Sequence, residues 1–167
     1  MKPPAARSAI PGPGRLGLVE PTAPGELREL GWVHVSKVEV LWALSRAANA
    51  DLALRTLVRL KDGLGDDWAE VDTALDTDKG LRGRLFGLLG ASSAFGDHLV
   101  AEPESWRLLA GDVELPTKQE ATDRLLAAVD ATPEPDAGDG ALSYRAAVTG
   151  PDAVAALRKC YRDELMV

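Results

Sequence analysis

The sequence predicts an all-α fold, a bundle of about six or seven short helices behind a disordered Pro/Gly-rich N-terminal tail. Every periodic segment repeats its apolar residues at the 3.6-residue spacing of a helix, and none alternates over the length of a strand. Aromatic residues make up 5% of the chain, so the core must be built mainly from leucine, valine and alanine, which suits helices better than a sheet sandwich. We therefore expect no sheet.

The first 31 residues are expected to form a flexible tail, because they hold six of the 11 prolines and few apolar residues. Proline fixes the φ angle and removes a backbone hydrogen-bond donor, and a segment with little apolar surface cannot offset the entropy lost on ordering. The exception is the short apolar patch of residues 16–19, Leu-Gly-Leu-Val, which has the chemistry to dock on a folded domain.

A helical domain is expected over residues 32–131, and its first two helices fall within residues 36–62. Ser36 and Asp51 each stand where a side-chain oxygen would cap a helix start. The helical period then places on the buried faces Val38, Leu41, Leu44 and Ser45 in the first helix and Leu54, Leu57, Val58 and Leu60 in the second. The joint between the two helices is short, which predicts antiparallel or steeply crossed neighbours.

Acidic residues gather between residues 66 and 78 and invite a metal interpretation: Asp66, Asp67, Glu70, Asp72, Asp76 and Asp78. A calcium loop of the EF-hand type starting at Asp76 needs a glycine at its sixth position and a glutamate at its twelfth, where this chain has Leu81 and Gly87. The favoured interpretation is a helix that starts at Asp66 or Asp67 and leaves the acids in water. Its inward residues would be Trp68, Val71 and Leu75.

The most distinctive stretch is residues 81–110, where two helical patterns meet at a Gly-Ala-Ser-Ser break. The first pattern carries leucines at positions 81, 85, 88 and 89, which form one apolar stripe. The second starts at Ser92 or Ser93, either of which can cap it, and stops at Glu102-Pro103 because a residue before proline disfavours the helical conformation.

Four glycines lie on one arc of the first of these helices, beside the leucine stripe: Gly80, Gly83, Gly87 and Gly90. Each glycine costs a helix about 1 kcal/mol relative to alanine, so four on one face ask for a reason. Close approach of another helix backbone would supply one. Simple tolerance on a poorly ordered helix is the alternative.

Two further helices are expected near the end of the chain. Thr117-Lys-Gln-Glu120 has the spacing of a capping box, and the helical period continues to about Ala131. Residues 132–141 are expected to form an acidic linker. Residues 142–167 then lead into a helix capped by Asp152, with an apolar stripe formed by Val154, Leu157, Tyr161 and Leu165.

This last stripe needs a surface to pack on, because a helix of about four turns is marginal in water by itself. Without such a surface, we expect the chain to fray from about Gly150 onward, or to self-associate through the stripe and expose Cys160 to oxidation.

The order of residues in two segments resembles a known enzyme family. LLGASSAFGDHLVAEPESWRLL, residues 88–109, and ALRKCYRDELM, residues 156–166, are similar to the N-terminal helical region of the bifunctional glutamine synthetase adenylyltransferase and adenylyl-removing enzyme. The resemblance covers the second half of the chain well and residues 38–62 more loosely. These are scaffold residues, so they identify a family and say little about chemistry.

The resemblance implies that this chain is the leading part of the adenylyl-removing half. In the family, this half removes AMP from a modified tyrosine of glutamine synthetase by phosphorolysis, and the other half attaches AMP from ATP. A nitrogen-signalling regulator and glutamine set the balance, and both reactions need magnesium. The nucleotidyltransferase domain is expected to follow a segment like residues 161–166, so this chain alone is expected to be inactive. The alternative is a stand-alone helical protein-interaction module without catalytic activity.

No catalytic, cofactor-binding or metal-binding residue is predicted in the chain itself. Asp76-Thr-Asp78 matches the Asp-x-Asp spacing of the metal-binding pair in the resembled family but lacks the apolar strand and the preceding Gly-Gly or Gly-Ser turn, so Asp78 is interpreted as a helix cap. Asp97 and His98 lack the spacing of a nucleophile triad with Ser92 or Ser93. His34 is isolated, and two histidines with one distant cysteine make no zinc pattern.

Charge and cysteine content limit the partners and the location. A net charge of -7 opposes attraction to nucleic acid or to an anionic membrane surface, both of which favour a basic face. The single cysteine, Cys160, cannot form an internal disulfide, and the chain opens without a secretory signal pattern. We therefore expect a cytoplasmic protein that binds neither nucleic acid nor membrane.

Overall fold

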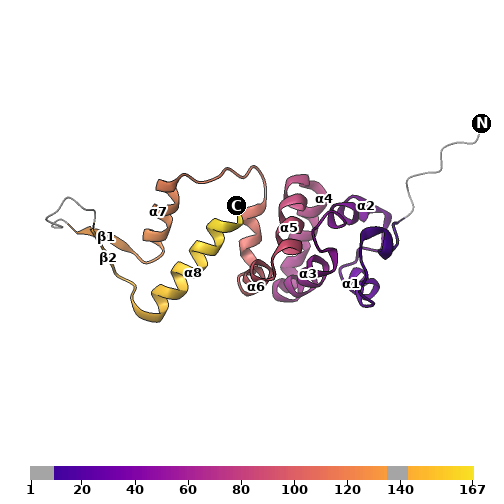
Figure 1. Cartoon of the computed structure of the whole chain (residues 1–167), viewed down its shortest axis with the longest axis horizontal. Coiled ribbons are helices and arrows are strands. Elements are labelled where there is room, and N and C mark those ends of the chain that lie inside the picture. Colours follow the sequence, from indigo (N-terminus) through magenta and orange to yellow (C-terminus); the bar gives the residue numbers. More distant parts are fainter. Residues whose placement is uncertain (1–9, 135–142) are drawn as a thin grey trace, which may run out of the picture. The chain divides into compact units, whose positions relative to one another are not determined.

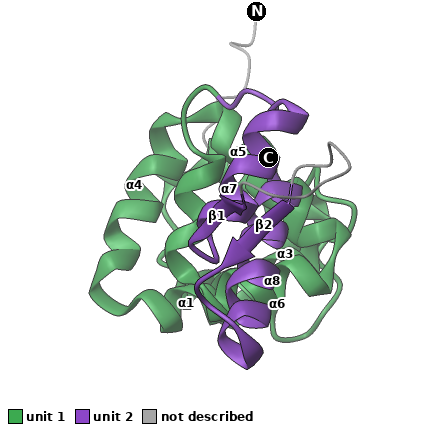
Figure 2. Cartoon of the chain, turned by 90° about the vertical axis from the view of Figure 1, so that its left-hand side faces the viewer, with its two compact units in different colours: residues 1–112 green, residues 113–167 purple. Residues whose placement is uncertain are grey.

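The chain folds into helices joined by short connections, with one small hairpin (Figure 1). The structure is a computed structural model and describes residues 10–134 and 143–167. It divides into two compact units, residues 1–112 and residues 113–167 (Figure 2), whereas the sequence predicted boundaries after residues 31, 131 and 141. The all-α prediction is confirmed for most of the described chain. No helix in the described residues has the length and apolar character to cross a membrane.

Unit 1 is built around two helices, α3 (Ala50–Leu64) and α5 (Lys79–Ala91). α3 packs against α1, α5 and α6, and α5 packs against α2, α4 and α6. The other elements of this unit are η1 (Pro13–Leu16), α1 (Ala23–Glu29), η2 (Val35–Lys37), α2 (Val38–Leu44), η3 (Gly65–Asp67), α4 (Trp68–Thr77), α6 (Ser93–Ala101) and η4 (Pro103–Leu109), where η marks a 3₁₀ helix.

The core of unit 1 consists mainly of leucines, as composition predicted. Three of the four stripe leucines of α5 are fully buried, at positions 81, 85 and 89, and α4 buries all three residues predicted to face inward. One aromatic cluster joins this leucine core: the Trp32 ring centroid lies 6.4 Å from that of Trp68 and 6.0 Å from that of Phe86. The indole N–H of Trp32 donates to Asp72 at 2.8 Å, so its polar atom is satisfied inside the core.

The N-terminal segment differs from the prediction. Residues 1–9 lie outside the described residues, but residues 10–31 are ordered and bury Leu16, Leu18 and Leu27. The prolines and glycines act here as helix boundaries: Pro13 begins η1, and Gly17 ends it with a φ of 76°, a conformation that favours glycine. Composition alone had suggested disorder except in the apolar patch of residues 16–19, and the docking expected of that patch is confirmed by the burial of Leu16 and Leu18.

A buried carboxylate also fastens this segment to α3. The backbone N–H groups of Val19 and Glu20 donate to the two oxygens of Asp51 at 3.0 and 3.2 Å. The predicted role of Asp51 as the α3 cap is therefore wrong, and Asn49 caps the helix instead by accepting from Leu52 N–H at 2.9 Å. The predicted Ser36 cap is also absent, because a 3₁₀ turn leads into α2 there.

Unit 2 contains α7 (Lys118–Ala127), the antiparallel strands β1 (Ala131–Glu134) and β2 (Ser143–Ala146), and α8 (Gly150–Met166). The capping box at Thr117 and Glu120 is confirmed, with both reciprocal hydrogen bonds present. α7 stops short of the predicted end at Ala131, because Asp130 adopts a φ of 49° and the chain turns into β1. The expectation of no sheet is wrong: residues 131–134, partly assigned to a linker, pair with β2, while residues 135–142 lie outside the described residues.

The apolar stripe of α8 faces solvent. The exposed fractions of Val154, Leu157, Tyr161 and Leu165 are 46, 37, 56 and 51%. The partly buried face of α8 instead carries the small residues Ala153, Ala156 and Cys160. α8 packs on α7, where Arg124 and Glu164 form an ion pair at 2.9 Å. The stripe that the sequence singled out as needing a surface thus has none within unit 2.

Candidate functional site

The two aspartates of the Asp-x-Asp pair hold different parts of unit 1 together. The Asp76 carboxylate pairs with the Lys37 ammonium at 2.7 Å, and the same ammonium lies 2.7 Å from Asp72. Asp78 caps α5, as predicted: one of its oxygens accepts from Leu81 N–H and the other from Gly111 N–H, both at 2.8 Å. Both carboxylates therefore have structural roles, and each has its own partners: Lys37 for Asp76, and the N–H groups of Leu81 and Gly111 for Asp78.

Asp78 also stabilises the end of unit 1. Arg84 donates to the carbonyls of Leu109 and Gly111 at 2.8 and 2.6 Å, so Gly111 is held both by Arg84 and by Asp78. The hydrogen bond from Leu81 N–H, followed by that from Gly111, lowers the pKa of the Asp78 carboxyl. The ionised form is thus favoured by folding.

Replacing Asp78 by alanine is expected to lower the free energy of unfolding by about 1–2 kcal/mol, because the α5 cap and the Gly111 link are both lost. Asn at this position keeps a cap acceptor and should cost less. Because folding lowers this pKa, the stabilisation is present above the ordinary aspartate pKa and is lost as the pH falls through the lowered value. Urea titrations of wild type, Asp78→Ala and Asp78→Asn across acid pH measure this, and equal losses in both variants at neutral pH would contradict the capping role.

The serine, aspartate and histidine near the α5–α6 break do not assemble a triad. Ser92 caps α6 by accepting from Phe95 N–H at 3.4 Å. Of the two serines predicted to cap this helix, Ser92 and Ser93, the first therefore does so. Asp97 points to the surface and pairs with Arg59 at 2.8 Å, whereas the neighbouring His98 is buried. Adjacent residues on a helix face different directions, so this histidine and aspartate are engaged separately.

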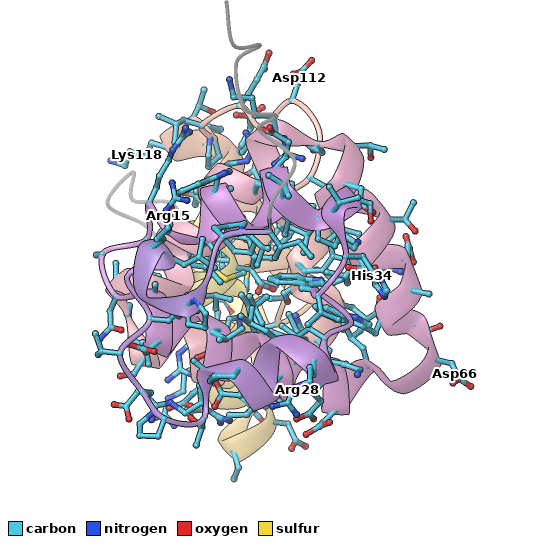
Figure 3. All side chains as sticks on the ribbon, turned by 90° about the vertical axis from the view of Figure 1, so that its right-hand side faces the viewer. Arg15, Arg28, His34, Asp66, Asp112 and Lys118 are labelled. Atoms are coloured by element: carbon cyan, nitrogen blue, oxygen red, sulfur yellow. The ribbon has the colours of Figure 1, made fainter. Side chains whose placement is uncertain are left out.

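The remaining candidate ligands are also scattered. His34 is exposed just before η2, Asp66 projects outward at the turn before α4 (Figure 3), and Cys160 lies on α8 in the other unit. Within residues 10–134 and 143–167, no three His, Cys, Asp or Glu side chains are grouped so that they could hold a metal ion. Burial, followed by the charges of Glu164 and Asp163, raises the pKa of the Cys160 thiol, which disfavours the reactive thiolate.

The glycine arc of α5 separates into positions with different roles. A Cβ atom at Gly90 would lie 2.7 Å from the Cβ of Ala47 and 3.1 Å from the carbonyl oxygen of Asn49, so a close approach is present there, but it is made by the joint between α2 and α3 and not by another helix. A Cβ at Gly83 or Gly87 would meet nothing within 4 Å. These two glycines instead line a hollow between α2 and α5 with a volume of about 320 Å³.

Sequence reasoning missed this hollow as a site. Arg46 lies more than 30 residues before Lys79 and Arg82 in the sequence, and only the packing of α2 on α5 brings these three cationic residues to one place. The one available signal was the glycine spacing, which indicated an open helix face without showing what lies opposite.

The full length of the chain matches curated enzymes. It is 58% identical over 168 aligned residues to the bifunctional glutamine synthetase adenylyltransferase/adenylyl-removing enzyme of Nocardia farcinica. The chain belongs to this enzyme family. Enzymes with the same name from Mycolicibacterium smegmatis and Mycobacterium avium are 49 and 44% identical to it, and each match covers 99% of the chain.

This member of the adenylyltransferase/adenylyl-removing family is a fragment of such an enzyme, since it spans only about 16% of the length of these relatives. The match extends beyond the residues that carried the resemblance and includes the N-terminal segment that docks on α3. No family model matches the chain, and no solved structure matches it.

Proposed function

We propose that this chain is a non-catalytic helical part of the adenylyl-removing half of an enzyme that regulates glutamine synthetase. The support is the identity of 58% over the whole chain to a relative whose name combines both activities. In the complete enzyme, magnesium and ATP would act at nucleotidyltransferase domains outside this chain. Glutamine synthetase and a nitrogen-signalling regulator would be its partners, in the cytoplasm.

The engagement of the acidic pair supports the proposal that this chain is inactive alone. Phosphoryl transfer depends on metal ions that clamp the phosphate oxygens, and positioning without that clamp supplies too little of the barrier reduction. Asp76 is paired with Lys37, and both oxygens of Asp78 accept backbone hydrogen bonds. Loading two metal ions onto them would break the α5 cap.

The test is an assay of the purified chain with adenylylated glutamine synthetase, magnesium and inorganic phosphate, and a second with unmodified glutamine synthetase and ATP. We expect neither release nor attachment of AMP above background. The complete enzyme from Mycolicibacterium smegmatis is the positive control. Activity of the chain that disappears in Asp76→Asn would show that this pair is catalytic.

A stand-alone interaction module is the second candidate, favoured by one observation. The four apolar side chains of the α8 stripe are 37 to 56% exposed, as expected of a surface that binds another protein. The two proposals differ in the coding sequence. A Gly-Gly or Gly-Ser turn and an Asp-x-Asp strand in the reading frame after Val167 would support the enzyme fragment over the module.

A further inference from the structure

We propose that the hollow between α2 and α5 binds a small organic anion in which a carboxylate or phosphate is joined to a flat apolar group. This goes beyond the function proposed above, because it needs neither a nucleotidyltransferase domain nor glutamine synthetase. The hollow lies entirely within unit 1. Its volume of about 320 Å³ falls at the lower end of the range of about 300–1,000 Å³ that small-molecule sites occupy.

Part of the lining of the hollow is bare helix backbone. Gly83 and Gly87 are one helical turn apart on α5 and both are exposed, and a Cβ at either position would meet open space. Packing among the described residues therefore does not require glycine at these positions, in contrast to Gly90. Each glycine still costs α5 about 1 kcal/mol relative to alanine. A ligand that packs against the helix backbone would explain why glycine is present at these two positions despite its cost to helix stability.

Part of the lining is aromatic. Trp42 is half-buried on α2, and Phe86 on α5 is almost fully buried, with 1% exposure. The guanidinium of Arg15, labelled in Figure 3, lies 5.6 Å from the centroid of the Trp42 ring and fixes a cation beside it. A half-buried indole at the wall of a hollow offers a flat surface for a planar ligand group.

The lining of the hollow carries a net positive charge, although the chain as a whole is acidic. The charged side chains are three cations and one carboxylate: Arg46, Lys79, Arg82 and Glu39. Arg82 is held in place at 9% exposure, because one of its terminal nitrogens donates to the carbonyls of Leu75 and Asp76 at 2.7 and 3.1 Å. The side chains of Arg46 and Lys79 are exposed and make no hydrogen bond or ion pair with any residue in the described part of the chain. These two cations are available to an anion.

The chemistry of the lining selects the ligand class. A neutral apolar molecule would leave the two available cations without a counter-charge. A bare inorganic anion would leave the Trp42 indole exposed to solvent. An oxyanion on a flat apolar group satisfies both, with charge-assisted hydrogen bonds from the guanidinium and ammonium groups.

The test is titration of the isotopically labelled chain, followed by amide and indole nuclear magnetic resonance signals, with four probes. Phenyl phosphate and phenylacetate carry both features, benzyl alcohol lacks the charge and inorganic phosphate lacks the ring. We expect saturable shifts of the Gly83 and Gly87 amides and of the Trp42 indole with one or both aryl anions, and the stronger of the two identifies the preferred oxyanion. Binding that benzyl alcohol or inorganic phosphate matches, or no saturable shift with either aryl anion, would overturn the proposal.

Two variants locate the binding. Gly87→Leu should fill the hollow and abolish the shifts while the fold is retained, and Ala69→Leu, on the exposed face of α4, is the matched control that should bind normally. Arg46→Ala combined with Lys79→Ala should weaken binding about tenfold, and Arg55→Ala, an exposed arginine of α3, should leave it unchanged. Undiminished binding in either the Gly87 variant or the double variant would place the ligand elsewhere and refute the site.

Discussion

Replacing Gly90 by leucine is expected to destabilise the protein by about 3 kcal/mol or more, because the added side chain has no room between α5 and the α2–α3 joint. Its first atom alone would lie 2.7 Å from the Ala47 methyl group and 3.1 and 3.2 Å from backbone atoms of Asn49 and Ala48. Backbone cannot rotate away as a long side chain can. The measurement is the free energy of unfolding from urea titration followed by far-ultraviolet circular dichroism.

Gly87→Leu is the matched control, since it makes the same change one turn earlier on the same helix. A Cβ there meets nothing within 4 Å, so the variant should be neutral or more stable by up to about 1 kcal/mol through helix propensity. Similar losses at positions 87 and 90 would mean that α5 itself, rather than close packing at Gly90, decides the outcome.

Replacing Leu16 by alanine is expected to cost about 2–5 kcal/mol, the usual range for truncating a buried leucine. Leu16 has 0% exposure and belongs to the apolar patch of residues 16–19, the one part of the N-terminal segment that was expected to dock. Val19, three residues later and 83% exposed, provides the control: Val19→Ala should change the free energy of unfolding by less than about 0.5 kcal/mol. If Leu16→Ala were as harmless as Val19→Ala, residues 10–31 would not be part of the core.

Several features with a local cause could be predicted from the sequence. The caps at Asp78, Ser92 and Thr117 depend on a side-chain oxygen and a backbone N–H only three residues apart, and all three are present. The inward face of α4 and the stripe of α5 follow from the helical period, which packing reinforces. The resemblance to the enzyme family also rested on residue order alone.

Features with a distant cause could not be predicted. Asp51 looked like a cap because it stands at a helix start, but its oxygens accept from residues more than 30 positions earlier in the chain. The hairpin pairs Ala131 with Ala146 through strands of four residues each, too short for an alternating pattern to be recognised. The hollow between α2 and α5 depends on how these two helices pack. Periodicity predicts which face of a helix is buried but not which helix packs against that face.

The attachment of the N-terminal segment to Asp51 has a consequence for the order of folding. Val19 and Glu20 are synthesised before the carboxylate that receives their N–H groups, at separations of 32 and 31 residues. α1 likewise packs on α3, which follows it in the chain. Such contacts close a long loop, and the entropy of that closure is lost before the contacts stabilise anything. During synthesis, residues 10–31 must therefore wait for α3 to emerge before they can make these contacts.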